Sequence, residues 1–148
     1  MIAVSWHGVP QYAARLLRAF CDQAHEEVVV IGTRAQVPVL GVEEALGRSI
    51  TWIEDTKADL SWSDLGLPVP DIFIQSGWDC RPFISLGKEV KKKDGKIIGL
   101  SDNNFRGDLR QYVGAVWFRL VYRKMFNAML VPGRSATRLM AFYGMPGT

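Results

Sequence analysis

Residues 2–32 read IAVSWHGVPQYAARLLRAFCDQAHEEVVVIG, and this stretch decides the fold class. Two short apolar runs, Ile2 to Ser5 and Val28 to Gly32, have the length and composition of buried β-strands. Between them, Pro10 to His25 carries apolar side chains at the spacing of one helix face. A strand, a helix and a second strand in this order predict a βαβ unit with two parallel strands.

The rest of the chain repeats this alternation. Four more β-rich runs follow, at Ile50 to Glu54, Asp71 to Gln75, Lys96 to Leu100 and Ala128 to Val131. Helical segments are predicted at Val42 to Arg48, Arg81 to Lys93, Asp108 to Phe126 and Ser135 to Tyr143, and Thr56 to Pro70 is predicted to be mostly irregular. We therefore predict an α/β fold: one Rossmann-like, doubly wound domain over residues 1–148, with a mostly parallel sheet of about six strands, mostly interior, and helices on both faces.

Composition is that of an ordinary globular protein, with 48% hydrophobic and 22% charged residues. The formal charge of +3 mildly favours anionic ligands such as phosphates. Two cysteines without metal-ligand spacing indicate a reducing compartment, and no metal or cofactor is expected. No apolar run approaches the roughly 20 residues that span a bilayer. We expect a cytoplasmic protein, with any membrane contact peripheral and at the inner face.

Two basic segments suggest other partners. The lysine run from Lys88 to Lys96 falls at a predicted helix end, where cations complement the helix dipole, so no nucleic-acid partner is expected. The helix around Trp117 is amphipathic and contains Arg119 and Arg123. Its aromatic residues recur at core spacing, so we expect core packing rather than membrane binding.

The right-handed crossover rule places the carboxyl ends of parallel strands at one edge, where such sheets bind ligands. The first loop at this edge contains His7 and Gly8 and leads into a helix N-terminus. Its free N–H groups and the helix dipole favour a phosphate or carboxylate, while His7 has the alternative of merely packing. The Gly-x-Gly-x-x-Gly fingerprint of NAD-binding domains is absent.

The second loop, after Gln75, contains Gly77, Trp78 and Asp79. Trp78 is a candidate platform for a sugar ring, and Asp79 either binds hydroxyl groups or caps the next helix, which we favour. Cys80 follows, but no activating group is adjacent in sequence, so we do not expect it to be a nucleophile.

The third loop is the densest polar cluster. It contains Ser101, Asp102, Asn103, Asn104 and Arg106. These donors and acceptors suit a polyhydroxylated ligand. The alternative is an Asx-rich turn whose side chains bond their own backbone.

Taken together, these segments resemble the N-terminal domain of family 4 (group 1) glycosyltransferases of the GT-B fold. The resemblance is carried by the glycine loop before the first helix and by four later stretches, which are residues 24–32 (AHEEVVVIG), 70–78 (PDIFIQSGW), 95–103 (GKIIGLSDN) and 126–133 (FNAMLVPG). Residues 143–146 (YGMP) resemble the approach to the interdomain linker.

The resemblance implies an acceptor-side domain of an enzyme that transfers a sugar from a nucleotide sugar to a glycan, lipid or small-molecule acceptor, with retention of configuration. It implies a C-terminal, donor-binding domain beyond this chain, and it implies that the isolated domain is inactive. The loop at Gly8 corresponds to the family's glycine loop, which approaches the donor phosphates. Many members carry a histidine after the fifth strand where this chain has Ser101 and Asp102, which leaves the catalytic base unknown and Asp102 as a candidate.

Two other readings stay open. One is a stand-alone Rossmann-like or flavodoxin-like module that binds a ligand or a partner. The other is an NADP-binding domain, which rests only on Arg34 after the second strand.

Overall fold

The computed structural model describes residues 1–35 and 39–145. Six parallel strands form one sheet in the order β3-β2-β1-β4-β5-β6, which confirms the predicted Rossmann-like fold. The strands are β1 (Ile2–Trp6), β2 (Val28–Thr33), β3 (Thr51–Ile53), β4 (Ile72–Ser76), β5 (Lys96–Leu100) and β6 (Ala128–Leu130). The order reverses between β1 and β4, and this switch point is where open α/β sheets bind ligands.

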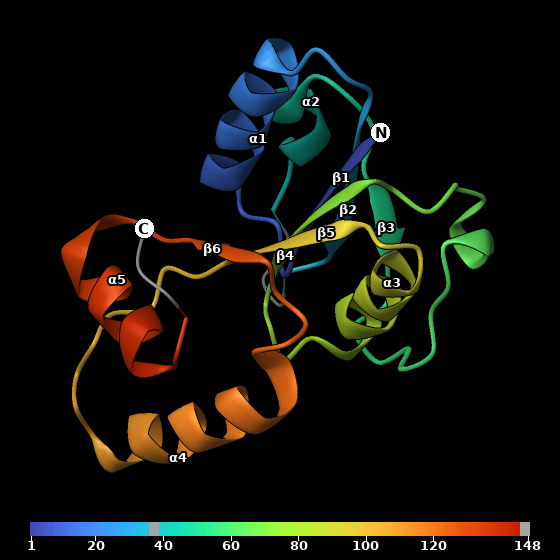
Figure 1. Ribbon diagram of the computed structural model, residues 1–148. Helices are drawn as coiled ribbons and strands as arrows, with labels where there is room; N and C mark the ends of the chain where they lie inside the picture. Colours follow the sequence, from blue (N-terminus) through green and yellow to red (C-terminus); the bar gives the residue numbers. More distant parts are fainter. Residues whose placement is uncertain (36–38, 146–148) are drawn as a thin grey trace.

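Two layers of helices sandwich the sheet (Figure 1). On one face lie α1 (Gln11–Gln23) and α2 (Val42–Leu46), whose Leu17 and Leu46 pack against Val4 and Val30. On the other face lie α3 (Arg81–Lys92), α4 (Leu109–Trp117) and α5 (Gly133–Phe142). Their buried side chains share a core with Ala3, Phe73 and Ile97 of the sheet.

The connection from β3 to β4 is mostly irregular, as predicted, and contains a 3-10 turn, η1 (Ser63–Leu65). It nevertheless carries a core residue, since Trp62 is fully buried. The Trp62 indole N–H donates to the Leu86 carbonyl of α3 at 2.9 Å, and the ring meets Phe73 edge to face. This crossover is therefore held on the same face as α3.

The predicted helix from Asp108 to Phe126 is composite. Asp108 caps α4 through its side chain, and the last turns, η2 (Phe118–Tyr122), are π-helical, with Arg123 N–H donating to the Phe118 carbonyl at 2.8 Å. Phe118 and Phe126 are buried as expected, but Trp117 is 56% exposed. The expectation of core packing was wrong for Trp117, because this helix is covered on one side only.

Candidate functional site

A groove of about 870 Å³ opens at the carboxyl ends of β1, β4 and β5. A second hollow of about 490 Å³ adjoins it and shares four lining residues, Trp78, Asp79, Asn103 and Arg110. All ten predicted site residues line one of the two. Eight line the groove, which are His7, Gly8, Gly77, Trp78, Asp79, Ser101, Asp102 and Asn103. The other two, Asn104 and Arg106, line the second hollow.

The glycine loop is fixed by bonds to neighbouring strands. Gly8 has a φ of 60°, the left-handed conformation that glycine adopts at little cost. The His7 N–H donates to Ser76 Oγ at 2.9 Å, and the Gly8 N–H donates to Thr33 Oγ1 at 2.7 Å. The expectation of free N–H groups was therefore wrong for these two residues. The loop is a rigid wall of the groove.

Trp78 is packed more than its loop position suggested. Its ring lies 5.7 Å from Phe118 and 5.3 Å from Tyr122, both at edge-type angles, and it is only partly exposed. These contacts anchor the second loop to the η2 segment. The ring also lines both hollows, so its use as a sugar platform stays a prediction.

Asp79 does not cap α3. The cap position is Cys80, which makes no side-chain cap bond, and Asp79 is exposed at the groove. Burial raises the pKa of the Cys80 thiol to about 11, so the thiolate is scarce near neutral pH. That pKa agrees with the prediction that Cys80 is no nucleophile.

The third loop is ordered by a glutamine that follows it. Gln111 Oε1 accepts from the backbone N–H groups of Arg106 and Gly107 at 2.8 and 2.9 Å, and its Nε2 donates to the Asn104 carbonyl at 2.7 Å. In the described residues, the side chains of Asp102, Asn103 and Asn104 make no hydrogen bond within the protein. The alternative of a self-bonded Asx turn is therefore wrong for these three residues, and their polar ends face solvent.

Ser101 differs from its neighbours because it is buried. Its backbone N–H donates to the Leu130 carbonyl at 3.1 Å, while its hydroxyl has no partner among the described residues. A buried hydroxyl without a partner costs free energy. Because Ser101 lines the groove, a bound ligand could satisfy this hydroxyl.

Sequence reasoning missed two features of the site. Arg110, in the first turn of α4, lines both hollows, and its place one turn after the polar loop was an available signal.

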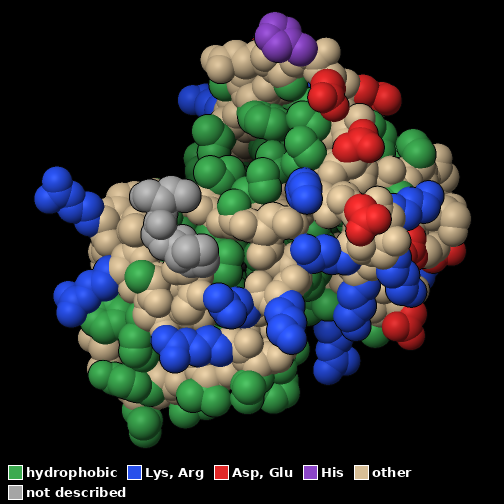
Figure 2. All heavy atoms as spheres, in the orientation of Figure 1, with side chains coloured by type: hydrophobic (Ala, Val, Ile, Leu, Met, Phe, Trp, Pro, Cys, Tyr) green, Lys and Arg blue, Asp and Glu red, His purple; other side chains and the backbone are tan. Residues whose placement is uncertain are grey.

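The second feature is an apolar wall. Figure 2 shows apolar side chains below α1, and those that line the groove there include Tyr12, Leu16 and Phe20. The outward exposure of a helix face could not be deduced from its periodicity.

The Arg34 guanidinium stacks on the Trp52 ring, with its carbon 4.8 Å from the ring centre. Arg34 is thus engaged by a neighbouring strand and lines neither hollow. The NADP reading, which rests on this residue, gains no support.

Comparison with family models found no match, and comparison with curated proteins found no relative. Among solved structures, the chain is similar to a protein of Listeria monocytogenes that is assigned as a UDP-N-acetylglucosamine 2-epimerase. The TM-score is 0.60 at 13% sequence identity, over 98% of this chain. At this sequence identity the likeness concerns the Rossmann-like fold alone. The chain spans 42% of the neighbour's length.

Proposed function

We propose that this chain is the acceptor-side domain of a glycosyltransferase that moves a sugar from a nucleotide sugar to a glycan, lipid or small-molecule acceptor, with retention. The observation that carries the proposal is the convergence of all ten predicted residues on two adjoining hollows at the switch point of the sheet. A polar rim beside an apolar wall suits a ligand with hydroxyl groups.

The structural neighbour supports the nucleotide-sugar part of the proposal. It is assigned to act on a UDP-sugar, and this chain matches less than half of it. We propose that a C-terminal domain binds most of the nucleotide sugar and closes on the groove. On this proposal the isolated domain is inactive, no metal or cofactor is required, and the enzyme works in the cytoplasm, where it meets its donor.

Asp102 is the candidate general base. Its carboxylate is exposed at the groove and makes no hydrogen bond within the described chain, so an acceptor hydroxyl can reach it. Asp79, on the neighbouring loop, is positioned to accept from other hydroxyl groups. Arg106 and Arg110 line the second hollow together with Asp79 and Asp108, so this hollow offers guanidinium donors to a polar ligand without a net positive charge.

The proposal is tested by titrating the isotope-labelled chain with a panel of nucleotide sugars, free sugars and sugar phosphates, while amide NMR shifts are followed. We expect shifts at Gly8, Gly77 and Asn103. The Ser101→Ala variant should bind about tenfold more weakly, since it removes a hydrogen bond to the ligand. Ser63→Ala, on the remote η1 turn, is the control. Shifts confined to residues outside both hollows would rule out this site.

A further inference from the structure

We propose that the exposed face of α4 and η2 docks on the surface of an anionic lipid bilayer. This face is defined by seven large apolar side chains that the fold leaves uncovered, which are Leu109, Tyr112, Val113, Val116, Trp117, Leu120 and Val121. The inference goes beyond the proposed function, because it concerns attachment to a membrane, although Val113 and Trp117 of this face also line the second hollow.

The exposed side chains form a continuous stripe. Leu109, Val113, Val116 and Leu120 recur at helical spacing, and their exposed fractions are between 60 and 79%. Trp117 lies beside them and is 56% exposed. The opposite side of the same helix carries the buried Ala115 and Phe118. The helix is therefore apolar on the face that meets the core and also on a face that meets solvent.

This amount of exposed apolar surface on one helix indicates a binding surface, because scattered single residues are the ordinary case. An aromatic residue among branched aliphatic ones, on a helix that lies flat, is typical of helices at a membrane interface. Within the described residues, no helix is long and apolar enough to cross a membrane. The contact would therefore be interfacial.

Charge favours an anionic bilayer over a second copy of this chain. Residues 103–148 contain seven of the 18 Lys and Arg residues but only one of the 15 Asp and Glu residues, so this part carries a formal charge of +6 and residues 1–102 carry −3. The one acidic residue, Asp108, is the cap of α4. Such separation favours a negatively charged surface over an identical chain, which would bring like charges together.

The cations lie beside the apolar stripe. Helical spacing places Arg110 on one flank and Arg119 on the other, and Arg106 and Lys124 lie at the two ends. Arg119 and Arg123 also donate to the Phe142 and Gly144 carbonyls, which fixes α5 against this helix. Figure 2 shows apolar side chains along the edge of the molecule where Figure 1 draws α4, with a row of Lys and Arg side chains directly above them.

Docking by this face would hold the second hollow at the lipid surface. Arg110, Val113 and Trp117 line that hollow and also belong to the docking face or its flank. The second hollow and the proposed membrane contact are thus adjacent.

The test is co-sedimentation of the chain with vesicles of phosphatidylcholine, either alone or mixed with phosphatidylglycerol. We expect binding to the mixed vesicles, weak binding to the neutral ones, and release as salt concentration rises. Removing the charges at the two ends of the stripe in Arg106→Gln with Lys124→Gln should weaken binding about thirtyfold, at about 1 kcal/mol per cation. The matched control is Lys92→Gln with Lys93→Gln, which removes the same charge from the end of α3.

The apolar stripe is tested by Val113→Ser with Leu120→Ser, and the matched control is Val39→Ser with Leu40→Ser, a Val and Leu pair exposed elsewhere. Only the first pair should abolish binding, and circular dichroism should show both to be folded.

Brominated acyl chains should quench the fluorescence of the bound chain, and Trp117→Phe should remove most of that quenching. The proposal is overturned if the folded chain does not bind anionic vesicles. It is also overturned if each control pair weakens vesicle binding as much as the matched test pair. A stable dimer that Leu120→Ser dissociates, without vesicle binding, would assign the face to a second copy instead.

Discussion

Trp62 has no place in the predicted strands or helices, yet it is fully buried. The segment around it carries the Ser, Gly and Pro signals of a loop, and those signals were correct for the backbone. They say nothing of where the side chain goes, because its burial depends on Leu86 and Phe73, which are distant in sequence.

Replacing Trp62 by alanine should destabilise the protein by about 3–5 kcal/mol, since the change leaves a large cavity and removes the hydrogen bond from the indole to the Leu86 carbonyl. Replacing the exposed Trp117 should change stability by only about 0.5 kcal/mol. Urea unfolding of both variants measures the difference. Equal losses would mean that Trp62 is not a core anchor.

Gln111 is the residue that gives the polar loop its shape, through three bonds to the backbone at Asn104, Arg106 and Gly107. Gln111→Ala should destabilise the protein by about 1 kcal/mol and accelerate amide hydrogen exchange at Arg106 and Gly107. Gln111→Glu keeps the two acceptor bonds, so it should keep slow exchange at those amides. Equally fast exchange in both variants would contradict the assignment.

The strands were the most predictable elements. All six lie within one residue of their expected ends, because short apolar runs bounded by turn residues have few alternatives. The three loops of the candidate site also lie at one edge, as predicted, since parallel strands bring their carboxyl ends there. Bonding within those loops was not predictable. Asp79 does not cap α3. The Thr33 hydroxyl accepts from the Gly8 N–H, and the Ser76 hydroxyl accepts from the His7 N–H.

The helix from Leu109 to Tyr122 illustrates the limit of periodicity. A spacing of about 3.6 residues identifies the helix but cannot assign its apolar side chains to core or solvent. Phe118 went to the core and Trp117 to the surface, although they are neighbours. The charges on the flanks distinguish the two faces only once the exposed face is known.

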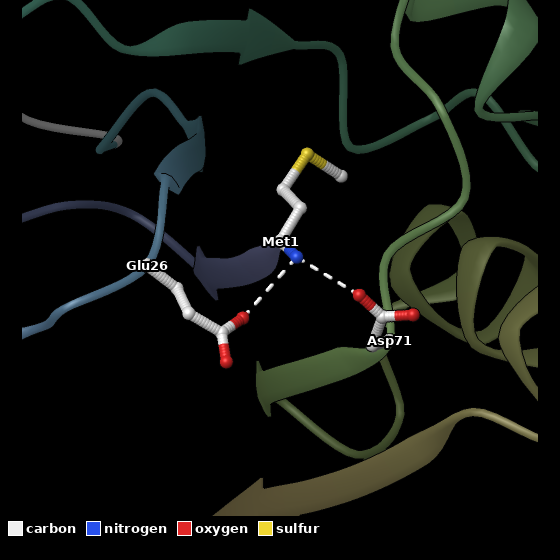
Figure 3. A network of polar contacts seen from close by, with 3 residues as sticks. All are labelled: Met1, Glu26 and Asp71. Atoms are coloured by element: carbon white, nitrogen blue, oxygen red, sulfur yellow. Dashed lines mark hydrogen bonds and ion pairs between the residues drawn. The ribbon is translucent and has the colours of Figure 1, made fainter.

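The amino group of the chain terminus links the starts of the three adjacent strands β1, β2 and β4 through two hydrogen bonds. The Met1 amino group lies 2.8 Å from Asp71 Oδ2 and 3.2 Å from Glu26 Oε2, just ahead of β4 and β2 (Figure 3). The hydrogen bond to Asp71, followed by the one to Glu26, raises the pKa of the amino group above 8.0. The same hydrogen bond from the amino group lowers the pKa of Asp71 below 3.8.

These pKa shifts predict a pH window for this contact. The protonated Met1 amino group stabilises the fold below pH 8.0, and this stabilisation is lost as pH rises through the raised pKa of the folded state. The ionised Asp71 carboxylate stabilises the fold above pH 3.8, and this stabilisation is lost as pH falls through the lowered pKa of the folded state. Asp71→Asn should therefore lower Tm between these limits, and the difference from wild type should shrink on either side. A difference independent of pH, measured by thermal melts, would exclude the ion pair as its cause.

The N-terminal and C-terminal parts of the chain differ in charge and in the surfaces that they form. The binding edge, the second hollow and the apolar face of α4 all involve residues after Ser101, where the positive charge is concentrated. The first βαβ unit contributes a rigid glycine loop and an apolar wall. This division fits the proposal that the domain receives an acceptor on one side and a nucleotide sugar across the groove.

Sugar transfer by the complete gene product tests this account most directly. The protein would be incubated with isotope-labelled nucleotide sugars and with lipid and glycan extracts of its source cells as acceptors. The account predicts that label moves from the nucleotide into an acceptor fraction, and that Asp102→Asn abolishes the transfer while Lys92→Asn does not. Label recovered only on the nucleotide, whether epimerised or unchanged, would contradict the assignment to a glycosyltransferase.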